Sequence, residues 1–151
     1  MIRVLVSPQP IDLAAEMARA ETGGAGAVAT FTGLVRADEH ADGAVAVLEL
    51  EHYPGGTERA LTRLAEQATA RWSLTAATIV HRVGPMRPGE RIVFVATAAP
   101  HRGAALDACS FLIDRLKTDA PFWKRETRGT TAGWVEARDA DHETAARWTA
   151  G

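Results

Sequence analysis

The sequence predicts an α+β fold with a mixed sheet, in one domain that spans residues 1–151. Three observations lead to this prediction. Short apolar, β-branched runs outnumber the segments with helical periodicity. The two kinds of segment interleave in the order β-α-β-β-α-β-β-α-β, which is typical of an α+β domain. The length of 151 residues suits a single core, and no repeat, linker or low-complexity segment divides the chain.

The first third of the chain is expected to hold a strand, a helix and two more strands. "RVLVS" predicts a short strand at 3–7, which the following prolines end. A helix is expected at 11–21, with Asp12 as its N-cap and the glycines of "TGGAG" as its stop. Strands follow at 27–36 and 44–53, separated by the polar turn "ADEHADG".

The strand at 44–53 is expected to have one buried face and one solvent-exposed face. Leu48 and Leu50 alternate there with Glu49 and Glu51. Because neighbouring side chains of a strand point to opposite faces, the leucines should be buried and the glutamates exposed.

The rest of the chain is expected to add two helices and three strands. An amphipathic helix is predicted at 57–72, and two strands at 76–84 and 90–99 flank the turn "PMRPG". A last helix should run from about residue 103 to about residue 118, before a proline stops it. "GWVEAR", residues 133–138, predicts a final short strand.

Composition narrows the class of protein. A formal net charge of −2 argues against a general nucleic-acid binder. No uninterrupted apolar run approaches 18 residues, and the N-terminal apolar run is too short for a secretory signal. One cysteine excludes an internal disulfide and suits a reducing cytoplasm. These features indicate a cytoplasmic protein.

The segment "LKTDAPFWKRE", residues 116–126, contains the only two lysines of the chain, Lys117 and Lys124. Fifteen of the seventeen Lys and Arg residues are arginine, so both lysines stand in a chain that otherwise uses arginine. A lysine amine can lose its proton or attack a carbonyl, whereas a guanidinium cannot. The turn at Pro121 could bring the two amines into one pocket. The residues leave two interpretations open: an active-site pair, or surface charges at a helix end.

Several other residues are candidates for binding. His101 and Arg102 precede the last helix, where they form either an anion site or a solvent-facing pair at a strand end. Arg36 and Arg138 each end a predicted strand, a common position for binding residues. Cys109 falls on the apolar face of the last helix and is expected to be structural.

Other kinds of site lack support in the sequence. His81 lies inside a predicted strand and is expected to pack or to form a hydrogen bond. The five histidines show neither HxH nor HxxxH spacing and there is no CxxC, so no metal site is predicted. No P-loop, GxGxxG or nucleophile elbow occurs, so no bound cofactor is predicted.

Taken together, the ordered motifs resemble a known family. "FTGLVR", "LELEHYPGGTERAL", "HRVGPMRPGE", "APHRGAALDAC", "LKTDAPFWKRE" and "WVEAR" look like the large, catalytic subunit of molybdopterin synthase. The resemblance covers about residues 3–148, and the lysine segment is its most specific part.

The resemblance implies a fold, a reaction and partners. The fold would be an α/β hammerhead with an additional antiparallel sheet. The reaction would convert cyclic pyranopterin monophosphate (precursor Z) into molybdopterin by installing two sulfurs as a dithiolene. Sulfur would come from the thiocarboxylated C-terminal glycine of a small ubiquitin-like subunit. Two large subunits would form a homodimer at the centre of a heterotetramer.

The resemblance also implies roles for individual residues. Lys117 would handle the thiocarboxylate or acyl intermediate, and Lys124 would act as an acid–base or substrate-binding group. Ile113 departs from the methionine expected beside the pocket, an apolar exchange of similar volume. The substrate-binding residues would be Arg36, His101, Arg102, Arg138 and Phe31. Some of the anion-binding ones among them would come from the second protomer.

Two alternatives compete with this function. A scaffold could dock a ubiquitin-like protein without catalysis, but such a scaffold would not need the two lysines. A pterin-binding or phosphate-ester enzyme of different chemistry could use the same basic residues. Dependence on the thiocarboxylated partner separates the synthase from both.

Overall fold

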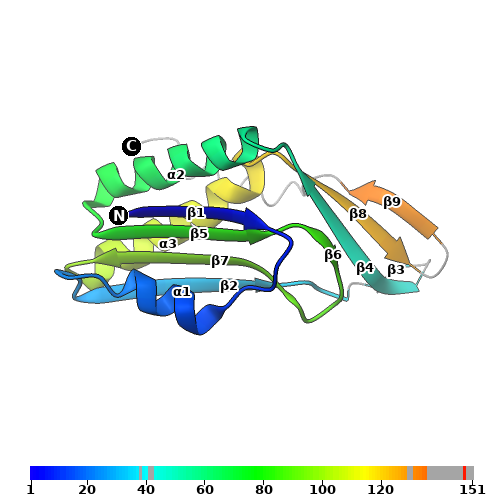
Figure 1. Ribbon diagram of the computed structural model, residues 1–151, viewed down its shortest axis with the longest axis horizontal. Helices are drawn as coiled ribbons and strands as arrows, with labels where there is room; N and C mark the ends of the chain where they lie inside the picture. The colour runs from blue at the N-terminus through cyan, green and yellow to red at the C-terminus, as the bar shows by residue number, and fades with distance from the viewer. Residues whose placement is uncertain (38, 41–42, 129–130, 136–147, 149–151) are drawn as a thin grey trace.

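A computed structural model describes residues 1–37, 39–40, 43–128, 131–135 and 148. Two sheets meet end to end, and three helices pack on the first of them (Figure 1). The first sheet has the strand order β1 (Ile2–Ser7), β5 (Ala76–Arg82), β7 (Arg91–Ala99) and β2 (Ala27–Leu34). The second has the order β3 (Glu39–His40), β4 (Gly43–His52), β8 (Phe122–Arg128) and β9 (Thr131–Val135), with β6 (Gly84–Met86) paired to β4.

The helices cover both faces of the first sheet. Helix α1 (Leu13–Ala20) lies on one face, against β5 and β7 (Figure 1). Helices α2 (Gly56–Trp72) and α3 (Arg102–Asp119) share the other face and contact each other. Strands β1 and β5 run parallel, whereas the other strand pairs are antiparallel. The prediction of an α+β fold with a mixed sheet is therefore confirmed, and the second sheet is the additional antiparallel sheet that the resemblance implied.

Two apolar clusters position the elements that carry the candidate site. The larger one lies between the first sheet and helices α2 and α3, where Leu61, Ile79 and Leu112 have no exposed surface. The second lies where the two sheets meet, and we call it the seam cluster. It consists of Val35, Val45, Leu48, Leu50, Val83 and Met86.

Most local predictions hold. The side chain of Asp12 accepts a hydrogen bond from the Ala15 N–H at the start of α1, as expected of its N-cap. In β4, Leu48 and Leu50 are buried, whereas Glu51 is exposed and Glu49 is partly exposed. The described residues contain no helix long and apolar enough to cross a membrane.

Three strands were not predicted, and β8 matters most. "FWKRETR" gives no strand signal in the sequence, because its charged residues hide any apolar alternation. The segment is a strand because β4 and β9 pair with its two edges and satisfy its backbone. Strands β3 and β6 are only two and three residues long, and β6 includes Pro85, so neither gives a strand signal in the sequence.

Candidate functional site

The structure brings Lys117 and Lys124 to the junction of the two sheets. Lys117 lies in the last turn of α3, and its side chain is exposed. Lys124 lies on β8, opposite Leu50 of β4, and is also exposed. Four residues, from Thr118 to Pro121, are enough to connect the helix end of Lys117 to the start of β8. Lys124 is thus held by a strand and not by the turn itself.

A buried histidine lies beneath this pair. The His81 ring stacks on the Phe122 ring, with centroids 4.0 Å apart and planes 26° from parallel. Nδ1 of His81 lies 2.9 Å from the Arg82 carbonyl oxygen, so this nitrogen carries the proton and donates it. Phe122 packs against both the main core and the seam cluster. The expectation that His81 packs and hydrogen-bonds is confirmed, and its stacking partner begins the strand of Lys124.

His81 is uncharged at neutral pH. Burial is the main cause that lowers its pKa from 6.5 to about 4, while its hydrogen bond to the Arg82 carbonyl acts in the opposite direction. The positive charges of Lys124, Lys117 and His52 lower the pKa further. Both lysines and His52 are therefore near enough to act electrostatically on this one imidazole.

The turn between β4 and α2 forms another wall of the junction. His52 ends β4 opposite Phe122, and its Nε2 lies 3.9 Å from a carboxylate oxygen of Glu58. Tyr53 follows with 60% of its surface exposed. Gly55 adopts φ 82°, a left-handed conformation that suits glycine, and lets the chain enter α2 at once. An exposed aromatic side chain therefore lies next in sequence to the junction.

Phe31 lies within β2, and Arg36 lies two residues after the end of this strand. Arg36 is exposed, and the preceding residue, Val35, belongs to the seam cluster. The Val35 N–H donates to the Glu90 carbonyl at 2.9 Å, which ties this segment to the turn before β7. Phe31 lies on the same face of β2 as buried Ala29, and 38% of its surface is exposed.

His101 and Arg102 lie at the far end of α3. Arg102 is fifteen residues before Lys117 on the same helix, which corresponds to about 22 Å. Both side chains are exposed, and in the part of the chain that the structure describes they form no side-chain hydrogen bond or ion pair. One protomer therefore does not bring them to the lysines. Arg138 lies outside the described residues.

Cys109 is a core residue, as expected. It is 7% exposed and packs in the main cluster. Burial raises the pKa of its thiol to about 11, against a smaller opposing effect of the Thr97 side chain. A thiol protonated at neutral pH is a poor nucleophile.

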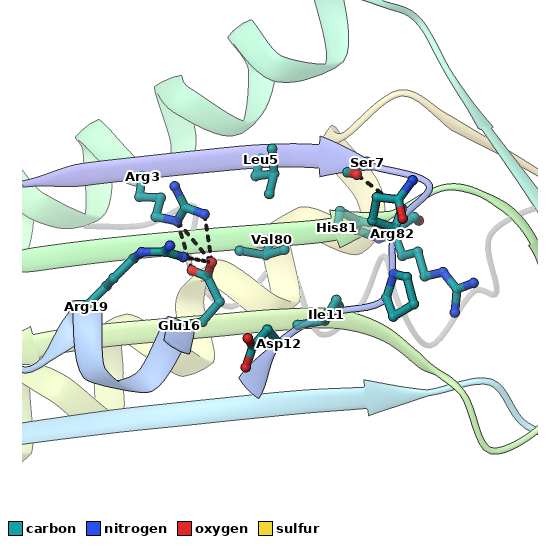
Figure 2. Close-up of a pocket in the computed structure, with 12 residues that line it drawn as sticks. Arg3, Leu5, Ser7, Ile11, Asp12, Glu16, Arg19, Val80, His81 and Arg82 are labelled. Atoms are coloured by element: carbon teal, nitrogen blue, oxygen red, sulfur yellow. Dashed lines mark hydrogen bonds and ion pairs between the residues drawn. The ribbon is translucent and has the colours of Figure 1, made fainter. Parts of the chain in front are cut away.

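A separate hollow of about 200 Å³ lies on the opposite, α1-bearing face of the sheet (Figure 2). Residues of β1, β5 and the segment before α1 line it, among them Leu5, Asp12 and Arg82. The arginines that line this hollow form hydrogen bonds and ion pairs with other groups of the protein. Arg82, for example, donates to the Pro8 carbonyl and to Glu90.

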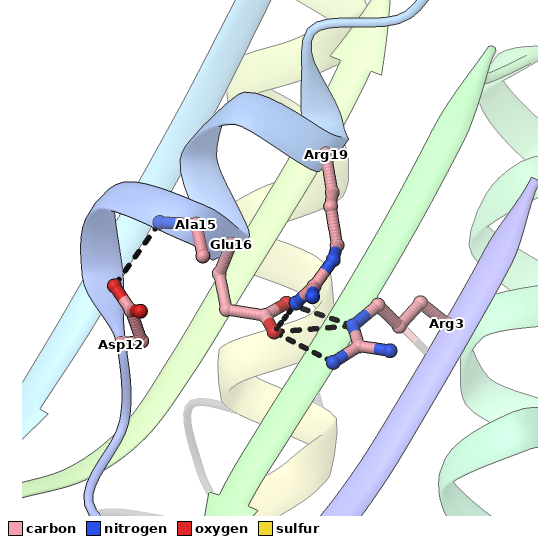
Figure 3. Close-up of polar contacts among 5 residues, drawn as sticks. All are labelled: Arg3, Asp12, Ala15, Glu16 and Arg19. Carbon is pink, nitrogen blue, oxygen red and sulfur yellow. Dashed lines mark hydrogen bonds and ion pairs between the residues drawn. The ribbon is translucent and has the colours of Figure 1, made fainter.

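Glu16 holds the other two arginines of this hollow (Figure 3). Its buried carboxylate accepts hydrogen bonds from Arg3 at 2.7 and 2.8 Å and from Arg19 at 2.6 Å. The hydrogen bonds from Arg3 are the main cause that holds the pKa of Glu16 below its ordinary value. This clamp ties α1 to β1, so we assign it a structural role.

The chemistry available at the junction is that of amines and cations. Among the described residues no group of three or more His, Cys, Asp and Glu side chains could hold a metal ion. The two lysines can bind an anionic group, and an amine that gives up its proton can transfer it or attack a carbonyl. Phe122 follows the Pro121 turn, where the sequence suggests an apolar wall. Sequence reasoning missed Thr57, because a threonine at the start of a predicted helix gives no sign of a contact outside that helix.

Comparisons with known proteins agree on one family. The family model described as "MoaE protein" matches residues 6–119. A protein of Brucella melitensis named molybdopterin synthase catalytic subunit is 48% identical over 151 residues, covering 97% of this chain and 91% of its own length.

Solved structures give the same answer. The molybdopterin biosynthesis MoaE protein of Burkholderia ambifaria superposes with a TM-score of 0.84 and 46% identity, with both chains fully covered. A complex of subunits 1 and 2 of molybdopterin-converting factor from Helicobacter pylori has a TM-score of 0.73 and covers 91% of each chain. At 18% identity, this last likeness supports the fold alone.

Proposed function

The chain belongs to the MoaE protein family of molybdopterin synthase catalytic subunits, and we propose that it converts cyclic pyranopterin monophosphate into molybdopterin. In this proposal the two sulfurs come from the thiocarboxylated C-terminal glycine of a small ubiquitin-like subunit. Cys109 is buried with a raised pKa, so the chain has no suitable sulfur carrier of its own.

One observation carries the proposal. The only two lysines of the chain, seven residues apart in sequence, are both exposed, one in the last turn of α3 and the other on β8, and the charge of each acts on the His81 ring. Lys117 receives the carrier's tail and handles the thiocarboxylate or acyl intermediate. Lys124 binds the substrate or exchanges a proton with it. Ile113, one helical turn before Lys117, supplies an apolar neighbour for the tail.

The arginines and His101 are proposed to bind the phosphate of the substrate. Arg36 serves the junction of its own protomer. His101 and Arg102 lie too far from the lysines within one chain, so in this proposal they serve the site of the second protomer of a homodimer. Phe31 lines the pocket and Arg138 adds a further cation. With a small subunit at each end, the assembly is a heterotetramer in the cytoplasm.

The test uses the purified chain, the cyclic precursor and a small subunit of the same family prepared in thiocarboxylated form. Dithiolene product should form with this carrier and not with its ordinary carboxylate form. Lys117→Ala should nearly abolish product. Lys117→Arg should fail as well, because a guanidinium keeps the charge but cannot lose its proton.

The outcomes separate the alternatives. Complex formation without any product would identify a docking scaffold, and turnover without the carrier would identify a different pterin enzyme. Normal turnover by Lys117→Arg would reduce the role of Lys117 to that of a fixed charge.

A further inference from the structure

Local contacts hold the end of α3, where the side chains of Arg115 and Thr118 hydrogen-bond to Asp119, but residues 120–121 have few local contacts of their own. Helix α3 ends at Asp119, and Ala120 is already extended, with φ −85° and ψ 129°. The Ala120 N–H makes a long 3.4 Å bond to the Leu116 carbonyl, and the Phe122 N–H donates to the Ala120 carbonyl at 3.0 Å. Pro121 has no N–H to contribute. Other parts of the protein must therefore fix this turn, residues 120–122.

Thr57, on the first turn of α2, reaches the turn from a distant part of the sequence. Its side-chain hydroxyl donates to the Pro121 carbonyl oxygen at 2.9 Å, across 64 residues of sequence. The Thr57 hydroxyl oxygen also accepts a hydrogen bond from the Tyr53 N–H at 2.9 Å, and the Thr57 N–H donates to the Tyr53 carbonyl at 2.8 Å. One hydroxyl thus joins the β4–α2 turn to the backbone between the lysines.

Burial makes this bond hard to replace. Thr57 has no exposed surface, so water does not take the place of its hydroxyl without rearrangement. On the other side, the His81 ring holds Phe122 by stacking at 4.0 Å. The turn is therefore fixed at two successive residues, Pro121 by its backbone and Phe122 by its ring.

We propose that Thr57 is a positioning residue: its hydrogen bond to the Pro121 carbonyl sets the placement of Lys117 relative to Lys124. The inference rests on the proposed function for its catalytic consequence, but the placement itself can be measured without it. An error of about 1 Å in the placement of reacting groups can cost about 100-fold in rate, so this bond should affect turnover although Thr57 lies outside the reacting groups.

The test compares three variants. Thr57→Val removes the hydroxyl at nearly constant shape, and Thr57→Ser restores it. Thr69→Val is the matched control, because Thr69 lies on the same helix, twelve residues further, and among the described residues its hydroxyl bonds only to the Ala65 carbonyl of that helix. Thr57→Val should lower kcat by about tenfold or more with a smaller change in KM. Thr57→Ser and Thr69→Val should stay within about twofold of the unmodified protein.

The two-lysine composition supplies a second readout. Protein labelled with 13C only at the lysine ε carbon should give just two signals, one each for Lys117 and Lys124. Thr57→Val should shift both lysine signals. In Thr57→Ser and in Thr69→Val both signals should have the positions found in the unmodified protein. If Thr57→Val does not fold, Thr57→Ala, which only removes atoms, takes its place.

The outcomes are distinct. Unchanged lysine signals in Thr57→Val would overturn the proposal, and so would shifted signals with normal kcat. If the unmodified protein makes no dithiolene but the signals shift as expected, the positioning by Thr57 stands and the proposed reaction falls.

Discussion

Replacement of His81 by asparagine should flatten the acid side of the stability profile. His81 is 5% exposed, and its pKa is lowered from 6.5 to about 4, chiefly by burial. Asparagine cannot titrate, but its side-chain amide can still donate to the Arg82 carbonyl, as Nδ1 does. The variant therefore removes the titration and keeps the hydrogen bond.

The sign of the effect follows from which state binds the proton first. As pH falls below 6.5 the unfolded chain takes up a proton at this histidine, whereas the folded chain does so only near pH 4. Neutral His81 therefore costs the folded protein no stability above pH 6.5. As the pH falls from 6.5 to about 4, the free energy of unfolding decreases. The full difference is worth about 3 kcal/mol, of which roughly 2 kcal/mol is lost between pH 7 and pH 4.5.

The assay is urea unfolding, followed by tryptophan fluorescence at pH 7 and pH 4.5 with the protein concentration held constant. Relative to His81→Asn, the unmodified protein should lose about 2 kcal/mol more of its free energy of unfolding between these pH values. Carboxylates with lowered pKa values, such as Glu16, contribute equally to both proteins and cancel. His101→Asn, at an exposed histidine, should keep the unmodified profile. Equal losses in the unmodified protein and His81→Asn would refute the reasoning, because a buried neutral imidazole must produce the difference.

Two further predictions concern groups outside the junction. At pH 8 the Cys109 thiol should react with iodoacetamide about 100-fold more slowly in the folded protein than in urea, since burial moves its pKa from 9 to about 11. Cys109→Ala should keep its turnover, and loss of activity in a folded variant would revive a role for the thiol. Glu16→Gln should lower the free energy of unfolding by about 2 kcal/mol, because the carboxylate that holds Arg3 and Arg19 loses its charge. Glu66→Gln, on the exposed face of α2, is the control, and equal effects in a urea titration would show that the clamp contributes nothing.

Much of the fold could be predicted because its signals are local. Alternation in β4, the Asp12 cap and the amphipathic pattern of α2 each depend on residues within one element. Strand β8 could not be found this way, because its stability comes from pairing with β4 and β9. The parallel pairing of β1 with β5 joins residues about 75 positions apart, and no local pattern encodes it.

The candidate residues could be named from the sequence, whereas the contacts that hold them in place could not. The two lysines stand out because every other Lys or Arg position in the chain is arginine. Thr57 could not be identified, because a threonine at the start of a helix normally serves the helix itself. Its role depends on a carbonyl 64 residues away, which only the tertiary structure brings within reach.

Lys117 and Lys124 belong to opposite halves of the molecule. Lys117 ends a helix that packs on the first sheet, and Lys124 is part of the second sheet (Figure 1). The distance between their amines therefore depends on how the two sheets pack against each other. Seam-cluster residues such as Leu50 and Met86 form that packing. A displacement of one sheet against the other would therefore change this spacing even if each sheet kept its own pairing.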